Sequence, residues 1–268
     1  MKKWLAVATW MLVAGAQAAP PERVVTLGGS VTEIVYGLGQ GGRLVGDDQS
    51  SLYPEAATRL PRVGYYRAVP VEGVLALKPD LVLASEQAGP PEAPRRLGEV
   101  GVRLVSVPDA PSVDSLKARI RAVAGEPMVR DVTRELAKAE AMPATRARAL
   151  LLINRNGAPQ GAGRGTAAAE VMHLAGLDNV LDGQQGYKPL SPEAIGALAP
   201  DMIIVTRESL QASGGLDGFA RLPGIAVTQA AAKRRIIVMD DLLILGLGPR
   251  LPQALIQLKQ EAAHAMAR

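Results

Sequence analysis

The chain lacks cysteine altogether and contains few aromatic or histidine residues. Its 268 residues include one Phe, two Trp, five Tyr and two His. Without cysteine, neither disulfides nor thiolate metal sites can form. Because aromatic side chains are so few, aliphatic residues must fill the core, and a hydrophobic fraction of 48% is ordinary for a globular protein.

Long apolar runs are also missing, except at the amino terminus. Lys2 and Lys3 precede an apolar run from Trp4 to Ala14, which is followed by Ala16-Gln17-Ala18. This pattern is typical of a cleaved export signal, and the run is shorter than the ~20 residues of a membrane-spanning helix. We therefore predict a signal peptide at residues 1–18. A lipoprotein would need a cysteine after its signal, so we expect a protein free in the bacterial periplasm.

A strong charge of either sign is absent as well. Without the two lysines of the leader, 28 basic and 26 acidic residues remain, a net charge of about +2. This balance argues against nucleic acid as a partner. The sequence also has no Gly-x-Ser-x-Gly elbow and no convincing Ser–His–Asp set, so we predict that the protein is not an enzyme. His173 and His264 are expected to be ordinary helix-surface residues.

The most informative feature that is present is an internal repeat. Residues 71–83 align with residues 192–204 without a gap, at an offset of 121 positions. Upstream, Gly64-Tyr65-Tyr66-Arg67 aligns with Gln185-Gly186-Tyr187-Lys188. A repeat of this length predicts two lobes built on one plan, which would face each other across a cleft.

Short β-rich runs alternate with helical segments in both halves of the chain. We predict strands at residues 23–27, 44–46, 81–83, 103–107, 149–153, 202–206 and 235–239. We predict helices at residues 32–38, 72–77, 95–100, 167–175, 193–198 and 252 to about 264. Between residues 111 and 148 the spacing is helical at residues 113–123 and 129–139, interrupted by Gly125-Glu126-Pro127, and no strand pattern occurs. The alternation predicts an α/β fold of two Rossmann-like lobes with parallel central sheets, residues 19–110 and 149–268, joined by a helical connector at residues 111–148.

Tyr65 and Arg67 are the first candidates for binding a ligand in the predicted cleft. In βαβ folds the binding crevice lies at the carboxyl ends of the strands, where the loop containing these residues is expected. Residues two apart in an extended segment project to the same side. A phenol ordinarily loses its proton near pH ~10, but ferric iron lowers that pKa and a guanidinium stabilises the phenolate. The pair suits a ferric ligand, but on these residues alone an ordinary surface loop with two half-buried tyrosines is the better explanation.

The segment from Val63 to Asp80 resembles the signature of periplasmic haem-binding proteins of ABC haem importers. The segments Gly186 to Glu193 and Asp240 to Arg250 are similar to that family too, and the resemblance runs from about Arg23 to the final helix. Its Lys-Pro-Asp part is shared with cobalamin and siderophore binders, whereas Gly-Tyr-x-Arg is the haem-specific element. The resemblance implies a class III periplasmic binding protein.

The resemblance also implies roles for the cleft residues. Tyr65 would be the axial ligand of ferric haem, and Arg67 would hydrogen-bond its phenolate. Tyr66 stands where the family varies, so it stays an alternative ligand. Some members bind a second haem through a histidine near the first helix of the second lobe. Residues 161–166 contain no histidine, so we expect one haem.

The second lobe offers three further ligand-binding candidates. Arg164 and Lys188 could hold the haem propionates or close the cleft, and Tyr187 occupies the position related to Tyr66.

Glu72 and Glu193 occupy equivalent positions of the repeat, each near the start of a short helix. The helix dipole alone favours carboxylates there. The resemblance implies that the two glutamates dock onto an inner-membrane ABC permease dimer, which works with its ATPase. Such exposed charges mainly steer and orient a partner. An outer-membrane haem receptor pathway would lie upstream.

Two other functions remain open. A siderophore or cobalamin carrier would use the same scaffold, and an exported enzyme would use the cleft as an active site.

Overall fold

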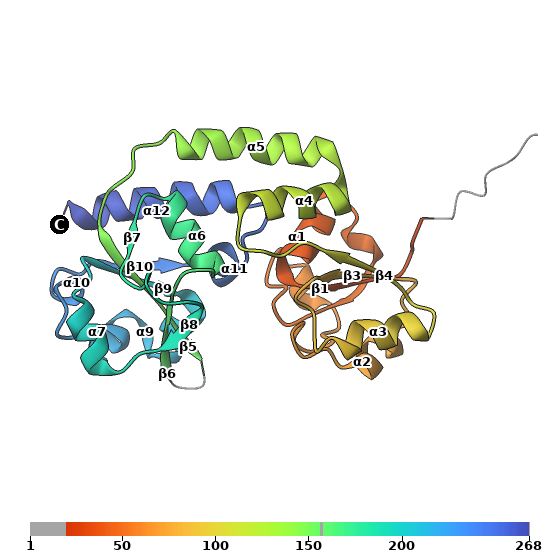
Figure 1. The fold of residues 1–268 in the computed structure, drawn as a ribbon, viewed down its shortest axis with the longest axis horizontal. Coiled ribbons are helices and arrows are strands. Elements are labelled where there is room, and N and C mark those ends of the chain that lie inside the picture. Colours follow the sequence, from red (N-terminus) through yellow and green to blue (C-terminus); the bar gives the residue numbers. More distant parts are fainter. Residues whose placement is uncertain (1–19, 156–157, 268) are drawn as a thin grey trace, which may run out of the picture.

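The computed structural model describes residues 20–155 and 158–267; the predicted signal peptide lies outside the described residues. Two α/β lobes lie side by side, each with its own sheet (Figure 1). Helices α5 (Glu126–Glu140) and α12 (Leu251–Met266) run along one side of the molecule. Among the described residues, no helix has the length and apolarity needed to cross a membrane.

The first sheet contains four parallel strands in the order β2-β1-β3-β4. These strands are β1 (Val24–Leu27), β2 (Leu44–Asp47), β3 (Leu81–Ser85) and β4 (Arg103–Val107). The helices between and beside them are α1 (Gly29–Gly37), α2 (Val71–Ala76) and α3 (Glu92–Glu99). Successive side chains of a strand point to opposite faces, and helices cover both faces, so nearly every residue of β1 and β3 is buried.

The second sheet has six strands and is mixed. Its order is β10-β9-β5-β6-β8, with β7 paired to the start of β5. These strands are β5 (Arg148–Arg155), β6 (Ala158–Ala162), β7 (Asp178–Asn179), β8 (Tyr187–Pro189), β9 (Met202–Thr206) and β10 (Ile236–Met239). Strand β6 runs antiparallel to β5 and to β8, whereas we expected a parallel sheet. Only two residues separate β5 from β6, and a crossover to a parallel strand needs a dozen or more.

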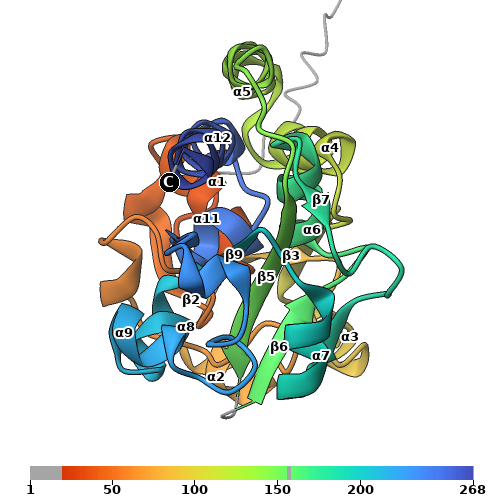
Figure 2. The ribbon, with the colours of Figure 1, turned by 90° about the vertical axis from the view of Figure 1, so that its left-hand side faces the viewer.

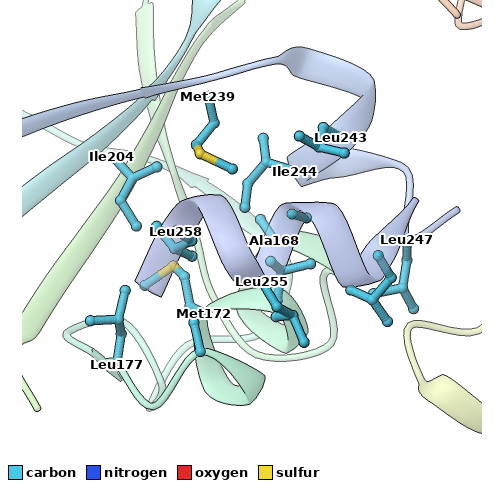
Figure 3. Close-up of a cluster of buried hydrophobic side chains, with 14 of the residues drawn as sticks. Ala168, Met172, Leu177, Ile204, Met239, Leu243, Ile244, Leu247, Leu255 and Leu258 are labelled. Atoms are coloured by element: carbon cyan, nitrogen blue, oxygen red, sulfur yellow. The ribbon is translucent and has the colours of Figure 1, made fainter. Parts of the chain in front are cut away.

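Helices surround this second sheet. They are α6 (Ala167–Leu174), α7 (Pro192–Leu198), α8 (Arg207–Ala212), α9 (Gly215–Ala220), α10 (Gln229–Ala232), α11 (Asp241–Leu245) and α12. The strands alternate between two apolar clusters. Leu150 and Leu152 of β5 face the cluster beneath α9 and α10, while Leu151 and Ile153 face the cluster beneath α6 and α12. Figure 3 shows part of the second of these clusters, with Met172 of α6 against Leu255 and Leu258 of α12.

Two helices connect the sheets, as the periodicity of residues 111–148 predicts. They are α4 (Val113–Ala124) and α5, with Gly125 between them at a positive φ of 79°. Figure 2, which views the molecule from the side of the second lobe, shows α4, α5 and α12 together on the side opposite α2 and α7. Ile34 of α1 and Leu116 of α4 belong to the same apolar cluster as Leu251 of α12. The lobes therefore share a core on the connector side, and the exact limits of the lobes stay a prediction.

The α/β fold class is confirmed. Each predicted strand and helix is present within a few residues of its expected position. The sequence did not reveal β6, β7 and β8 or the short helices α8 to α11.

Candidate functional site

The loop that contains Tyr65 leaves the edge of the first sheet through a glycine. Gly64 has φ of 97°, and a Cβ there would lie 3.0 Å from Cδ of Pro70. Its carbonyl accepts a hydrogen bond from the Gln49 N–H at 2.8 Å. Just before it, the Arg62 guanidinium pairs with Asp47 at 2.9 Å, and burial raises the pKa of the Asp47 carboxyl to about 7. Backbone conformation and a buried ion pair thus fix where the tyrosine segment starts.

A buried carboxylate connects this loop to the first βα turn. Asp48 accepts hydrogen bonds from the backbone N–H groups of Gly28 at 2.9 Å, Ser50 at 3.0 Å and Tyr66 at 3.2 Å. Its side chain is fully buried. Since Gly28 follows β1 and Asp48 follows β2, the tyrosine loop is held at the carboxyl edge of the sheet, where ligands bind in such folds.

The two adjacent tyrosines differ in their surroundings. Their ring centroids lie 5.0 Å apart with an interplanar angle of 72°. Tyr66 packs against the apolar cluster that includes Val63 and Val69. Burial raises the pKa of the Tyr66 phenol above its ordinary value, and the nearby Arg67 offsets only part of that effect. Tyr65 is half-buried and is not part of this cluster. Burial thus disfavours a phenolate at Tyr66, and the role of Tyr65 as the ligand stays a prediction.

Arg67 stands beside both phenols. Its Cζ lies 5.0 Å from the centroid of the Tyr66 ring, and its charge interacts with the phenols of both Tyr65 and Tyr66. Burial acts to lower the pKa of the guanidinium, but the two phenols outweigh burial and raise it. Arg67 thus stays a cation and can stabilise a phenolate oxygen at Tyr65.

A second charged pair lies near Arg67. Asp109, which follows β4, pairs with Arg119 of α4 at 2.7 Å and accepts a hydrogen bond from Ser85 at 2.6 Å. Burial raises the pKa of the Asp109 carboxyl, although the positive charges of Arg119 and Arg67 act against it. Arg119 also donates to the Ser30 hydroxyl at 2.5 Å. These contacts tie the end of β4 to the start of α1.

The predicted second-lobe residues lie close together. Arg164 forms an isolated parallel β-bridge with Gln185, and the Gly186 N–H donates to the Arg164 carbonyl at 2.9 Å. Tyr187 is half-buried against the core shared by the lobes, as Tyr66 is against its own. Arg164 and Lys188 are exposed. The structure brings Tyr65, Tyr66 and Arg67 together on the first lobe and Arg164, Tyr187 and Lys188 together on the second.

Arg164 also borders a pocket of about 410 Å³. Pro111 of the connector and His173, exposed on α6, line it as well. Three carboxylates face it, from Glu170, Asp178 and Asp182. Their negative charge makes this pocket a poor place for carboxylate groups of a ligand.

Glu72 and Glu193 lie exposed in the first turns of α2 and α7. The backbone N–H of Glu193 itself and the Ser191 hydroxyl lower the pKa of the Glu193 carboxyl. Helices α2 and α7 lie on the same side of the molecule in both Figure 1 and Figure 2. The two glutamates therefore have related settings.

Equivalent hydrogen bonds in the two halves of the repeat hold helices α2 and α7 in position. In the first lobe, the Arg23 side chain donates to the carbonyls of Leu77 at 2.7 Å and Lys78 at 3.0 Å. In the second lobe, the Arg148 side chain donates to the carbonyls of Leu198 at 2.8 Å and Ala199 at 3.2 Å.

The aspartates of the repeat, Asp80 and Asp201, accept equivalent backbone hydrogen bonds. Asp80 accepts from the Arg23 N–H at 3.1 Å, and Asp201 from the Arg148 N–H at 2.9 Å. The shared Pro-Asp sequence thus fixes a short helix to the first strand of each lobe.

Sequence reasoning missed several polar residues near the site: Asp48, Asp109, Arg119, Glu33 and Arg250. Asp48 and Asp109 each follow a predicted strand closely, and that placement at a carboxyl edge was the available signal. Arg250 of the second lobe pairs with Glu33 of α1, and no local pattern indicates that contact.

Comparison with known proteins identifies the family to which the chain belongs. The periplasmic binding protein family matches residues 24–243. Among solved structures, the periplasmic heme-binding protein RhuT from Roseiflexus sp. RS-1 is 39% identical, with a TM-score of 0.87, and the alignment covers 92% of this chain and 99% of that one. The periplasmic heme-binding protein BhuT, solved in complex with two hemes, is 37% identical with a TM-score of 0.84, covering 91% and 98%.

Among curated relatives, the uncharacterized ABC transporter substrate-binding lipoprotein YvrC of Bacillus subtilis (strain 168) is 27% identical over 90% of this chain and 79% of its own length. Other curated relatives match over a shorter length. The Vitamin B12-binding protein of Vibrio vulnificus (strain YJ016) is 36% identical over 104 residues, which is 39% of this chain and 38% of that protein. The family and these neighbours are binding proteins of the periplasm rather than enzymes. A family match over most of the sequence, together with the same fold at 39% identity, shows that the chain belongs to the periplasmic binding protein family.

Proposed function

We propose that this protein captures ferric haem between its lobes, with Tyr65 as the iron ligand, and delivers it to an inner-membrane ABC importer. The arrangement of Tyr65 and Arg67 carries the proposal. Tyr65 is not part of the apolar cluster of its lobe, and Arg67 lies close enough for its charge to act on the Tyr65 phenol. The similarity to RhuT over 99% of its length supports haem as the cargo.

The first lobe supplies the chemistry of capture. A phenolate oxygen suits ferric iron, and Arg67 offsets the negative charge that forms on Tyr65 when it binds. Tyr66 would stay a neutral phenol because its packing against the apolar cluster raises its pKa, and it supports the loop by that packing. On the second lobe, Arg164 and Lys188 are exposed cations that would pair with the propionates, with Tyr187 beside them.

The decisive experiment is a titration of the purified protein with ferric haem, followed by absorption spectroscopy. Tyr65→Phe should abolish the phenolate-to-iron charge-transfer bands and weaken binding. Arg67→Met should weaken binding while keeping the bands. The matched control is Tyr66→Phe, one position away, which should keep the wild-type spectrum. A wild-type spectrum in Tyr65→Phe together with an altered one in Tyr66→Phe would reassign the ligand, and no Soret shift in wild type would refute haem.

The same titration measures stoichiometry. We propose one haem, because residues 161–166 provide no histidine for a second. The structure of BhuT with two hemes makes the endpoint worth measuring. An endpoint at two equivalents would contradict the single-haem proposal without changing the cargo.

Delivery would use the side of the molecule that carries α2 and α7. Glu72 and Glu193 lie exposed there, one on each lobe, and a two-lobed protein facing a permease dimer needs one contact per lobe. We assign these carboxylates to docking on the importer and its ATPase, with an outer-membrane haem receptor pathway upstream. A signal peptide at residues 1–18 would direct export to the periplasm without a lipid anchor.

Cobalamin is the second candidate cargo, because the Vibrio vulnificus relative is named a vitamin B12-binding protein. That match covers only 38% of the relative's length, whereas the matches to heme-binding proteins cover nearly whole chains. Calorimetric titration with cyanocobalamin beside haem separates the two. Tight binding of cyanocobalamin alone would replace the haem proposal.

A further inference from the structure

A buried ion pair joins the two lobes beside the connector. Arg250, the residue before α12, pairs through Nε with Oε1 of Glu33 in α1. Only 16% of the Arg250 side chain and 2% of the Glu33 side chain are exposed. Since α1 covers the first sheet and α12 covers the second, this pair links the two lobes. Its residues lie 217 positions apart in the sequence.

Further contacts hold Arg250 in place. Its Cζ lies 3.6 Å from the centroid of the Tyr53 ring, so the guanidinium stacks on an aromatic residue of the first lobe. Its Nη2 lies 4.0 Å from Oδ1 of Asp240 and has no hydrogen-bond partner among the described residues. Arg250 therefore has two partners on the opposite lobe and one acidic neighbour on its own.

The segment before Arg250 lies close to the first lobe as well. A Cβ on Gly248 would lie 2.7 Å from Oε2 of Glu33, so a side chain there would displace the Glu33 carboxylate. The Leu247 carbonyl accepts a hydrogen bond from Arg119 of α4 at 3.4 Å. Ile34, next to Glu33, belongs to the same apolar cluster as Leu247. Polar and apolar contacts thus join the lobes at one place.

We propose that Arg250 is a positioning residue that clamps the second lobe to α1 and sets the separation of the lobes. A covalent connector alone would let the separation of the lobes vary. A buried ion pair between the lobes resists their separation, because breaking the pair leaves uncompensated buried charges. The clamp therefore prolongs retention of a ligand held between the lobes. This last step rests on the proposed function, whereas the clamp itself does not.

The test measures the distance between the lobes in the ligand-free protein. Because the chain has no cysteine, Val100→Cys and Leu216→Cys provide two specific spin-label sites. Both positions are exposed, at 60% and 49%, and they lie on different lobes. At pH 8, where the Glu33 carboxyl is ionised, double electron–electron resonance should show a broader distance distribution in Glu33→Gln and in Arg250→Ala than in the parent. The matched control is Arg59→Ala, which breaks the exposed Arg59–Glu55 pair within one lobe and should leave the distribution unchanged.

Glu33→Gln keeps the shape of the side chain and so decides the outcome if Arg250→Ala fails to fold. A folded Glu33→Gln protein with the parent's distance distribution overturns the clamp. In haem-loaded protein, the same variant should release haem to apomyoglobin about tenfold faster, because loss of one partner of a buried charge pair acts mainly on dissociation. An unchanged release rate beside a broadened distribution overturns the step from clamp to retention. Absence of haem binding in the parent would refute the cargo and leave the distance test intact.

Discussion

Tyr65 and Tyr66 are neighbours in sequence but have different surroundings. Tyr66 packs into the apolar cluster of its lobe, and Tyr187, its counterpart in the repeat, packs against a core in the same way. The counterpart of Tyr65 is Gly186, which has no side chain. Core packing is thus the property that the two lobes share at this position. Tyr65 is an addition of the first lobe, which is why we assign the ligand role to it.

Gly64 provides a test of how the tyrosine loop is built. Gly64→Ala should lower the free energy of unfolding by roughly 1–2 kcal/mol, because a side chain at a positive φ is strained, and should weaken haem binding by displacing Tyr65. Chemical denaturation and haem titration measure both effects. The control is Gly98→Ala in α3, where a Cβ would meet nothing within 4 Å. Equal unfolding energies for Gly64→Ala and wild type would contradict the strain.

The sequence predicted Tyr65 and Arg67 because their chemistry is contained in one short motif. It could not predict the pairing of Glu33 with Arg250, because no local pattern connects residues 217 positions apart. The family resemblance favours Tyr65 over Tyr66 as the ligand. The packing of Tyr66 against the apolar cluster supports that assignment, which stays a prediction.

Helices α2 and α7 are short, with six and seven residues, and depend on contacts outside themselves. Isolated helices of this length are unstable in water. Arg23 and Arg148 satisfy carbonyls at their carboxyl ends, which would otherwise lack partners. The repeat thus preserves the anchoring of two helices that each carry an exposed glutamate.

Arg148→Met should loosen α7 and leave α2 unchanged. We expect a loss of about 1 kcal/mol in the free energy of unfolding, since the hydrogen bonds are exposed, and faster amide exchange in residues 192–201. Hydrogen–deuterium exchange with mass spectrometry resolves the two helices. Arg23→Met is the matched control and should produce the mirror result, with faster exchange in residues 71–80. Faster exchange of both helices in either variant would contradict separate anchoring.

Elements with a continuous aliphatic run were predictable, and those formed by pairing were not. Strands β5 and β9 carry such runs, and both were expected. Strand β6 contains Pro159 and Gly161, which disfavour strands, and it is ordered by pairing with β5 and β8. Helices α8, α10 and α11 have four to six residues, too few for a periodic pattern. Capping by Thr206, Thr228 and Asp240 defines where they start.

Two buried carboxyls make the stability of the whole molecule depend on pH. Burial raises the pKa of Glu33 from 4.5 to about 7, although Arg250 acts against it, and it raises the pKa of Asp47 to about 7 as well. Between pH 4.5 and 7 the native carboxyl of Glu33 binds a proton that the unfolded chain has released. Stability from this group is therefore full below pH 4.5 and is lost as pH rises towards 7.

Glu33→Gln should remove that part of the pH dependence. The difference between 4.5 and about 7 corresponds to at most roughly 3 kcal/mol. Wild type should lose this much more unfolding free energy than the variant between pH 4.5 and 7, as urea denaturation at several pH values measures. Glu55→Gln, at an exposed position, should retain the wild-type slope. Parallel slopes for Glu33→Gln and wild type would show that Glu33 ionises normally.

The proposed docking on the importer would involve both lobes. Glu72→Arg combined with Glu193→Arg should leave haem binding intact and abolish uptake in proteoliposomes that contain the importer. Each single reversal should reduce uptake partially, because electrostatic pairs at exposed sites mainly steer and orient. Glu55→Arg, an equal change of charge on an exposed residue outside α2 and α7, is the control. Undiminished uptake by the double variant would exclude these carboxylates from docking.

The shared core beside the connector has a consequence for the integrity of the molecule. Among the described residues, the chain passes from the first sheet to the second once, through α4 and α5. A single protease cut at Gly125 would therefore separate the polypeptide into two fragments. Ile34 and Leu251 would still share one apolar cluster, and Glu33 would still pair with Arg250. The nicked halves should co-elute as a noncovalent heterodimer and separate only in denaturant.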